Sequence, residues 1–266
     1  MKERPRFPAK LNTDQTSAPK TLLAATRVIT PNTGARNAAK PAALSPTGVG
    51  LDSSAIRARM VQKLAEQGIQ NEAVLAAMGQ IERHRFVDSA LVNQAYEDTS
   101  LPIGLGQTIS KPNVVARMMA LLREAPGLQG RPMGRVLEIG TGCGYQAAVL
   151  SLLAREVYSI ERLRGLHDKA RENLRPMRLP NVHVIFGDGM LGYPQGGPYS
   201  AIVSAAGGEA MPQAWIDQLA EGGRIVAPMQ TRAGQQALVV VDKTPQGLKQ
   251  MLLEPVLFVP LKSGID

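Results

Sequence analysis

The stretch Val136-Leu137-Glu138-Ile139-Gly140-Thr141-Gly142-Cys143-Gly144-Tyr145 has the pattern of a buried strand that runs into a tight glycine loop. Glycine permits positive φ and lets a ligand approach the main chain closely. Residues 146–154 have helical character, and the start of a helix offers unpaired N–H groups to a ligand. The acidic Glu138 disfavours a pyrophosphate here and favours a cation. The pattern therefore indicates a nucleoside with a sulfonium centre and no phosphate, which is S-adenosylmethionine.

The same loop also fits a second class of protein. Gly142-Cys143-Gly144-Tyr145-Gln146-Ala147 satisfies the pattern G-x-G-x-x-A, the fingerprint of dinucleotide binding. The loop alone leaves a methyltransferase and a dehydrogenase equally open, so other parts of the chain have to separate them.

Composition excludes several further classes. The chain has 266 residues, 44% of them hydrophobic, which is enough for one large domain with a sizeable core or for two small ones. It has no apolar run of about 18 residues, so no membrane span is expected. The single cysteine, Cys143, argues against a disulfide framework and a cysteine-rich metal site, and indicates a reducing cytoplasm. The three histidines are scattered, so no metal site is predicted.

The net charge of +8 is concentrated near the beginning of the chain. Residues 1–50 hold eight Lys and Arg against one Glu and one Asp, which leaves only +2 for residues 51–266. This basic segment is rich in Pro, Ala and Thr without sustained periodicity, so a disordered extension is predicted. A transit peptide or a basic arm that contacts nucleic acid stays open. Residues 51–266 are expected to form one domain, with a helical covering part at 51–133 and a cofactor-binding core at 134–266.

The covering part shows helical periodicity. Apolar residues recur at helical spacing from Ile56 to Leu64, and Asn71 can cap a second helix. A third helix is expected at 112–123. Between the second and third helices, a proline and two glycines interrupt the segment 96–110, which is predicted to be irregular.

From residue 134 onward, strands alternate with helices. Apolar runs of strand length lie at 135–139, 156–160, 182–186, 199–204 and 223–228, and helical segments at 145–154, 163–174 and 212–220. This alternation predicts a mostly parallel sheet with helices on both faces. The last apolar runs, 236–241 and 251–259, are joined by a connection too short for a crossover helix, so they should pair antiparallel. Such a sheet favours the α/β, Rossmann-like fold of S-adenosylmethionine-dependent methyltransferases over a dinucleotide fold.

Polar residues follow the strands, where an open α/β sheet binds its ligand. Glu161 closes the second strand, and its carboxylate can accept hydrogen bonds from both ribose hydroxyls. A solvated, helix-capping role is the alternative for Glu161. Asp188 lies between Gly187 and Gly189 after the third strand, where it can reach an adenine amino group or make an ordinary Asp-Gly turn.

These segments together resemble a known family. The glycine loop is joined by Ala95-Tyr96-Glu97-Asp98, Leu101-Pro102-Ile103-Gly104 and Gln107-Thr108-Ile109-Ser110-Lys111-Pro112, all similar to segments of the protein-L-isoaspartate O-methyltransferases. The resemblance runs from about residue 55 to Leu261. Many methyltransferases share the glycine loop, whereas Thr-Ile-Ser before a proline is far more restricted. Lys111 and Cys143 depart from the family pattern, and residues 1–50 have no counterpart in it.

The resemblance implies methyl transfer from S-adenosylmethionine to L-isoaspartyl residues, the β-linked products of Asn deamidation and Asp isomerisation in damaged proteins. It implies that Ser110 is the active-site residue and that Thr108 and Ile109 border the ligands. The predicted cofactor site is completed by Glu138, Gly140, Thr141, Gly142, Gly144 and Tyr145 of the loop, Glu161 for the ribose, Asp188 and Gly189 for the adenine and, more loosely, Gln236. No metal, no specific nucleic acid and no membrane partner are expected, and a cytoplasmic monomer is predicted.

The implied chemistry needs no general base. An isoaspartyl α-carboxylate has a pKa of roughly 3.5, so it is ionised at neutral pH and alignment of the two reactants is the main demand. The Ser110 hydroxyl can hold that carboxylate by hydrogen bonding. The alternative role for Ser110 is as N-cap of the helix predicted from Pro112, and the two roles are compatible.

Two other functions are weighed. A methyltransferase for RNA, DNA or a small metabolite is disfavoured, because Ser204-Ala205-Ala206-Gly207 stands where base N-methyltransferases carry an Asn-Pro-Pro-Tyr type segment. The sequence also lacks a Pro-Cys nucleophile. A non-catalytic nucleic-acid-binding module that uses residues 1–50 would lose its binding on their deletion, whereas methyl transfer would survive.

Overall fold

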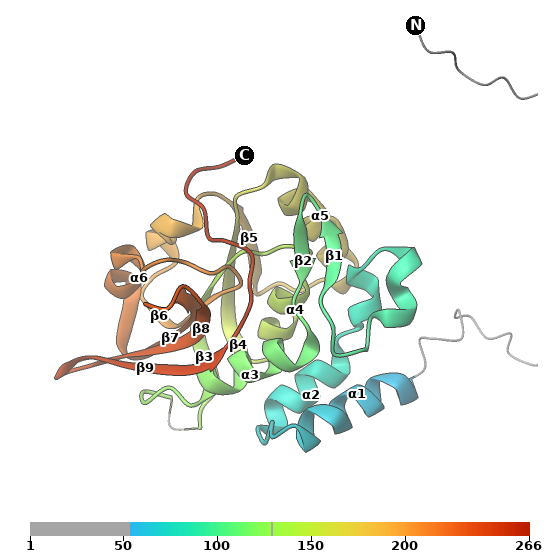
Figure 1. The fold of residues 1–266 in the computed structure, drawn as a ribbon, viewed down its shortest axis with the longest axis horizontal. Helices are drawn as coiled ribbons and strands as arrows, with labels where there is room; N and C mark the ends of the chain where they lie inside the picture. The colour runs from blue at the N-terminus through green and yellow to red at the C-terminus, as the bar shows by residue number, and fades with distance from the viewer. Residues whose placement is uncertain (1–53, 129) are drawn as a thin grey trace, which may run out of the picture. The chain divides into compact units, whose positions relative to one another are not determined.

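The computed structural model describes residues 54–128 and 130–266, and the expectations for residues 1–50 lie outside them. The described residues form an α/β fold built on a seven-stranded sheet, together with a two-stranded hairpin (Figure 1). The sheet consists of β3 (Met133–Ile139), β4 (Ala154–Glu161), β5 (Val182–Phe186), β6 (Tyr199–Ser204), β7 (Leu219–Gln230), β8 (Gln236–Thr244) and β9 (Gly247–Pro255). The hairpin consists of β1 (Leu101–Gly104) and β2 (Gln107–Ile109). The α-helices are α1 (Ser54–Glu66), α2 (Glu72–Gln80), α3 (Pro112–Arg123), α4 (Tyr145–Ser151), α5 (Arg164–Leu174) and α6 (Gln213–Gln218).

The strand order in the sheet is β5-β4-β3-β6-β7-β8-β9. Strands β3 to β7 run parallel, whereas β8 pairs antiparallel with both β7 and β9. The expected mostly parallel sheet with a C-terminal antiparallel hairpin is thereby confirmed. Strands β4 and β5 extend the sheet on one side of β3, and β6 and β7 extend it on the other side. The strand order therefore changes direction between β3 and β6. Such a switch point opens a crevice at the carboxyl ends of the strands, where ligands bind.

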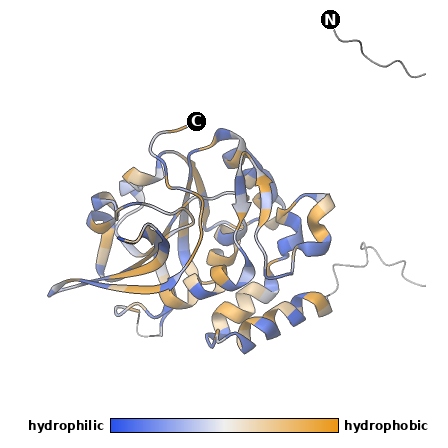
Figure 2. Cartoon of the chain, viewed as in Figure 1, coloured by the Kyte–Doolittle hydropathy of each residue, from blue (hydrophilic) through white to orange (hydrophobic). Residues whose placement is uncertain are grey.

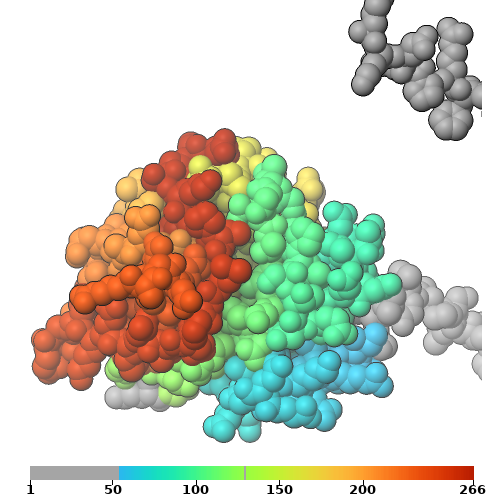
Figure 3. Space-filling model, in the orientation of Figure 1, coloured from blue at the N-terminus to red at the C-terminus, as the bar shows by residue number. Residues whose placement is uncertain are grey.

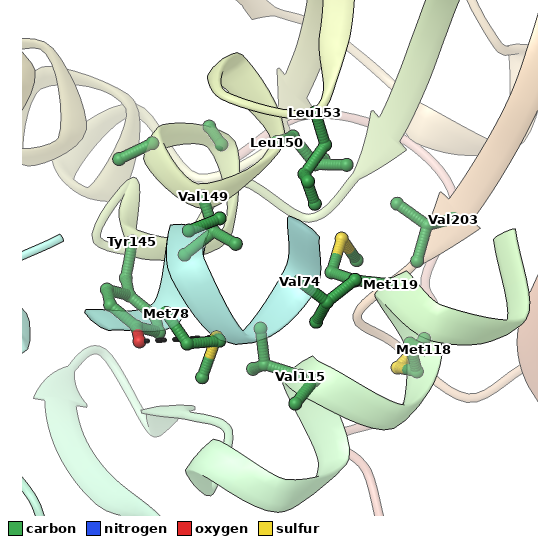
Figure 4. Close-up of a cluster of buried hydrophobic side chains, with 14 of the residues drawn as sticks. Val74, Met78, Val115, Met118, Met119, Tyr145, Val149, Leu150, Leu153 and Val203 are labelled. Carbon is green, nitrogen blue, oxygen red and sulfur yellow. Dashed lines mark hydrogen bonds between the residues drawn. The ribbon is translucent and has the colours of Figure 1, made fainter. Parts of the chain in front are cut away.

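Alternating side chains of β3 pack into two hydrophobic clusters, one on each face of the sheet. Val136 belongs to the cluster under α1 to α5, whereas Leu137 and Ile139 belong to the cluster that contains Trp215 of α6. Figure 4 shows the first cluster where α2, α3 and α4 meet, with Val74 from α2 among its members. Complete burial of one such aliphatic side chain contributes about 1.5–3 kcal/mol, so both clusters hold the sheet to its helices.

The helices of the covering part follow the predicted pattern closely. The Asn71 side chain accepts a hydrogen bond from the Val74 N–H at 3.2 Å, which caps α2 as expected. Helix α3 begins at Pro112 and ends at Arg123, as predicted. Hydrophilic and hydrophobic residues alternate along these helices in Figure 2, as expected where one side of a helix faces the core.

Four local expectations were wrong. The segment 96–110 is not irregular throughout, since β1 and β2 pair within it. The helix expected at 212–220 ends at Gln218, and β7 already begins at Leu219. Strand β9 ends at Pro255, so the last apolar run leaves the sheet early. Helix α4 ends at Ser151, because β4 begins at Ala154 and leaves no room for another turn.

After β9 the chain crosses the carboxyl edge of the sheet toward α5 (Figure 1). Gly207, which follows β6, donates its N–H to the Val259 carbonyl and accepts the Leu261 N–H, both at 2.8 Å. Further along, Asp266 N–H donates to the Arg162 carbonyl at 2.9 Å. These bonds fix the last residues of the chain above the crevice at the switch point.

Candidate active site

A cavity of about 390 Å³ lies at the carboxyl ends of β3 to β6. Its volume falls in the range of small-molecule sites, about 300–1,000 Å³. The predicted site residues that line it are Thr108, Gly140, Gly142, Glu161 and Gly189. Its apolar walls include Ile103, Ile139, Ile160, Leu163 and Leu166. A cavity that combines apolar side chains with a buried carboxylate suits a nucleoside, whose base is flat and whose ribose donates hydrogen bonds. We call it the donor cavity.

The glycine loop exposes its main chain to the donor cavity. Gly140 and Gly142 take φ values of +89° and +57°, a region that disfavours any residue with a Cβ atom. A Cβ on Gly142 would lie 3.2 Å from the Ile103 Cδ1 atom, which belongs to the hairpin on the other side of the cavity. Gly144 is the N-cap of α4. A side chain at Gly142 would occupy space in the cavity that a ligand needs.

Glu161 joins the end of β4 to the glycine loop. Its Oε2 accepts the Gly142 N–H and its Oε1 accepts the Leu163 N–H, each at 2.9 Å. Glu161 is only 4% exposed, so it is not solvated, whereas its bond to Leu163, the N-cap residue of α5, agrees with the helix-capping part of the alternative. A carboxylate offers about four acceptor positions, so about two stay available after these bonds, which matches the two hydroxyls of a ribose.

Gly189 forms the part of the cavity wall that follows β5, and Asp188 precedes it in the chain. Asp188 makes the expected tight turn, since its Oδ1 accepts the Met190 N–H at 2.8 Å, while its Oδ2 accepts the Gly264 N–H at 2.6 Å. The buried Trp215 donates its indole N–H to the Gly189 carbonyl at 2.8 Å. Asp188 thus holds the C-terminal segment against the cavity, and its contact with an adenine stays a prediction.

Glu138 lies one layer below the donor cavity and does not line it. It is fully buried, and its Oε2 accepts a short hydrogen bond from the Ser159 hydroxyl, which also bonds the Thr141 hydroxyl. Its Oε1 and the Gln146 amide nitrogen have no hydrogen-bond partner among the described residues. Burial, reinforced by the charge of Glu161, raises the pKa of Glu138 to about 8, although the hydrogen bond from Ser159 opposes the rise. Glu138 is therefore largely protonated at neutral pH.

The raised pKa of Glu138 predicts a distinct pH dependence of stability. Between about pH 4.5, the ordinary pKa of the side chain, and about pH 8, the folded protein holds a proton that the unfolded chain releases. The free energy of unfolding of the wild type should therefore fall, relative to Glu138→Gln, by about 3–5 kcal/mol as the pH rises through this window. Urea unfolding of both proteins between pH 5 and pH 8 measures the difference. Parallel profiles would contradict a protonated Glu138.

A second cavity, of about 740 Å³, adjoins the first and shares Thr108, Ala205 and Val259 with it. Ser110 lies on its wall. Side chains alternate along this segment, so Thr108 and Ser110 face the cavities while Ile109 is buried in the core. We call this second cavity the acceptor cleft. A molecule held at Ser110 meets a molecule held at the glycine loop across the shared wall.

The start of α3 leaves Ser110 free for a ligand. Lys111, and not Ser110, is the N-cap, and its side chain makes no capping bond. The Asn113 N–H donates instead to the Asp98 carboxylate at 2.9 Å. The N-cap alternative for Ser110 is therefore wrong. Among the residues that the structure describes, the Ser110 hydroxyl makes no hydrogen bond.

Tyr145, Thr141 and Gln236 also lie away from both cavities. The Tyr145 side chain lies in the core, where its hydroxyl donates to the Met78 sulfur at 3.7 Å (Figure 4). Thr141 faces Ser159 and lies in the layer of Glu138. Gln236 bonds the Phe258 main chain twice, accepting its N–H at 2.7 Å and donating to its carbonyl at 3.2 Å. Gln236 thus supports the C-terminal segment, and a direct contact of these three with a cofactor stays a prediction.

Two segments that sequence reasoning did not assign to the site also line the donor cavity. They are the tip of the β1–β2 hairpin, with Leu105, and the end of the chain, with Lys262 and Asp266. Figure 3 shows the hairpin and the C-terminal segment side by side on one face. Glycines on both sides of Leu105 between short alternating runs are a hairpin signal that could have been used. The path of the C-terminal segment has no local signal, because it depends on residues far away in the sequence.

Neither a metal cluster nor a membrane helix was found in residues 54–128 and 130–266. No group of three or more His, Cys, Asp or Glu side chains in this part of the chain is arranged to hold a metal ion. None of the helices in this part of the chain has the length and apolar character needed to cross a membrane.

The family model of protein-L-isoaspartate(D-aspartate) O-methyltransferase matches residues 55–266. The chain belongs to this family. The resemblance seen in the sequence is thereby confirmed. The protein-L-isoaspartate O-methyltransferase of Leptothrix cholodnii is 61% identical over 231 residues, which cover 86% of this chain and 80% of that protein. The enzyme of the same name from Methylibium petroleiphilum is 58% identical over 224 residues, covering 84% of this chain and 82% of that protein.

Solved structures of the family share the fold. A protein-L-isoaspartate O-methyltransferase that is 29% identical aligns with a TM-score of 0.69 and covers 79% of this chain and 67% of its own. A putative family member from Plasmodium falciparum, solved with S-adenosyl-L-homocysteine, is 24% identical and has a TM-score of 0.64 over 77% of this chain and 98% of its own. At 24% identity, the similarity to the Plasmodium falciparum structure shows a shared fold and nothing more.

Proposed function

We propose that this chain transfers a methyl group from S-adenosylmethionine to the free α-carboxyl group of L-isoaspartyl residues in damaged proteins. The ester formed in this way begins repair through a succinimide. The observation that carries the proposal is the wall that the donor cavity and the acceptor cleft share at Thr108, Ala205 and Val259. Two cavities that meet at one wall suit direct transfer between two bound molecules, and family membership supports the substrate class.

The residues of the donor cavity fit S-adenosylmethionine. The Glu161 carboxylate would hold the ribose hydroxyls, and the open main chain at Gly140 and Gly142 would approach the methionine part. Asp188 and Gly189 would face the adenine. When bound, S-adenosylmethionine supplies an electrophilic methyl group and a neutral thioether leaving group.

The protein's own task in this reaction is to orient the acceptor. A carboxylate with a pKa of roughly 3.5 is already ionised at neutral pH, so no side chain has to remove a proton. The Ser110 hydroxyl would donate a hydrogen bond to one carboxylate oxygen and leave the other free to attack. Such positioning can lower a barrier by about 7–11 kcal/mol in favourable cases.

We also propose a role for each part of residues 51–266. We assign residues 51–133 to covering the two ligands, which the hairpin at the donor cavity supports, and residues 134–266 to the cofactor-binding core. The single, buried cysteine supports a reducing, cytoplasmic location. We also expect the protein to act as a monomer on isoaspartyl proteins and peptides, with no specific nucleic acid or membrane partner.

Transfer of labelled methyl to a synthetic isoaspartyl peptide, compared with its normal aspartyl twin, tests the function. We expect the isoaspartyl peptide to be labelled and its twin to stay at background. Equal labelling of both peptides would point to a methyltransferase with another substrate. A folded protein that binds the donor but labels neither peptide would contradict the proposal.

A further inference from the structure

Arg83 carries its charge into the core of the protein. It begins the 3₁₀ helix Arg83–Phe86 and is fully buried. In the described part of the chain its Nη1 makes no hydrogen bond, and no carboxylate forms an ion pair with it. Burial lowers the pKa of its guanidinium group. Because a buried charge is costly unless it is compensated, the remaining contacts of Arg83 have to offset that cost.

Those contacts connect the two halves of the site. The Arg83 Nε donates to the Ala95 carbonyl at 2.7 Å, and Nη2 lies 3.5 Å from the Thr99 carbonyl. The guanidinium carbon lies 4.8 Å from the ring centroid of Tyr145, in cation–π geometry. Tyr145 is the first residue of α4 after the glycine loop, whereas Thr99 lines the acceptor cleft. Arg83 therefore ties a wall of the acceptor cleft to the helix that follows the donor loop.

The segment that Arg83 holds also supports the start of α3. Asp98 lies between the two carbonyls that Arg83 binds, and its carboxylate accepts the Asn113 N–H at 2.9 Å. Asp98 and Asn113 both line the acceptor cleft, as does Ser110. If residues 95–99 moved, Asp98 would leave the first turn of α3 and the wall beside Ser110 would change shape.

We propose that Arg83 is a positioning residue for the acceptor. It holds in place residues 95–99, of which Asp98 and Thr99 line the acceptor cleft, so it contributes to binding of the isoaspartyl peptide and not to binding of S-adenosylmethionine. This inference rests on the proposed function, because it takes the cleft beside Ser110 to be the acceptor site.

Kinetics of Arg83→Met and Arg83→Lys test the proposal. Methionine keeps much of the volume but donates no hydrogen bond, and lysine keeps the charge without the planar fork. We expect Arg83→Met to raise the KM for the peptide about 10-fold or more, with the Kd for S-adenosylhomocysteine within about twofold of the wild type. Arg83→Lys should show a smaller rise. Arg85, exposed on the same 3₁₀ helix and paired with Glu82, gives the matched control Arg85→Met, which should change neither constant.

Hydrogen exchange gives a second measurement that needs no activity. In Arg83→Lys, the amides of residues 95–99 and of Asn113 should exchange about 10-fold faster or more, while those of the glycine loop keep their wild-type rates. The proposal would be overturned if the KM for the peptide stayed unchanged. It would also be overturned if the KM for the peptide and the Kd for S-adenosylhomocysteine rose together and amides throughout the protein lost their protection. A wild type that methylates no isoaspartyl peptide would refute the proposed function, whereas unchanged exchange at residues 95–99 would refute the role of Arg83.

Discussion

Ser110→Ala is expected to lower kcat toward an isoaspartyl peptide by about 100-fold, while affinity for S-adenosylmethionine changes little. Ser110 lines the acceptor cleft, and its hydroxyl makes no hydrogen bond with any described residue. Its removal leaves the carboxylate without an orienting donor but leaves the donor cavity unchanged. Steady-state kinetics with the peptide, together with calorimetry with S-adenosylhomocysteine, separate the two effects.

A matched control for Ser110→Ala is Ser89→Ala. Ser89 is exposed on the 3₁₀ helix Ser89–Gln94 and lines neither cavity, so its loss should leave kcat unchanged. A correctly folded Ser110→Ala protein with wild-type turnover would remove Ser110 from the mechanism.

Glu161→Gln should weaken binding of S-adenosylhomocysteine by about 100-fold or more, because hydrogen bonds to a charged group contribute about 1.5–3 kcal/mol each. Glutamine has nearly the same shape as glutamate, but its amide nitrogen cannot accept a hydrogen bond. The two carboxylate oxygens accept N–H groups from Gly142 and Leu163, so an amide nitrogen in either orientation would face a donor. The loss should therefore combine weaker ribose binding with a displaced glycine loop. Isothermal calorimetry measures it directly.

Glu156→Gln is the control for this substitution. Glu156 lies on the same strand, β4, and its carboxylate contacts the His183 ring nitrogen at 2.7 Å, away from the donor cavity. We expect this variant to bind the ligand like the wild type. If Glu161→Gln also kept wild-type affinity, the assignment of Glu161 to the ribose would have to be given up.

The success of the sequence predictions follows from how local their physical causes are. Helix α3 could be placed from Pro112 to Arg123 because proline, apolar spacing and length are all properties of that segment. The antiparallel pairing of β8 with β9 followed from a connection too short for any crossover. The glycine loop was recognised because its positive φ values restrict the residue type at those positions.

The errors arose where neighbours distant in the sequence decide the outcome. Ser110 matched the N-cap preference, but the Asn113 N–H is bound by Asp98, fifteen residues earlier. The carboxyl of Glu138 lies beneath the loop against Ser159, a position that no local pattern specifies, and its contact with a cofactor stays a prediction. The C-terminal segment closes the donor cavity through bonds to Gly207 and Arg162, which no pattern within the segment predicts.

Residue order alone was enough to identify the strands of the seven-stranded sheet, the α-helices, the glycine loop and the family, because periodicity and backbone preference act within a few residues. Only the folded chain decided that Thr108, Ala205 and Val259 form one wall, and that Glu161 is buried between two N–H groups. These relations depend on how strands from distant parts of the chain pair and on which carboxylates become buried from solvent. They are consequences of packing, which local sequence does not specify.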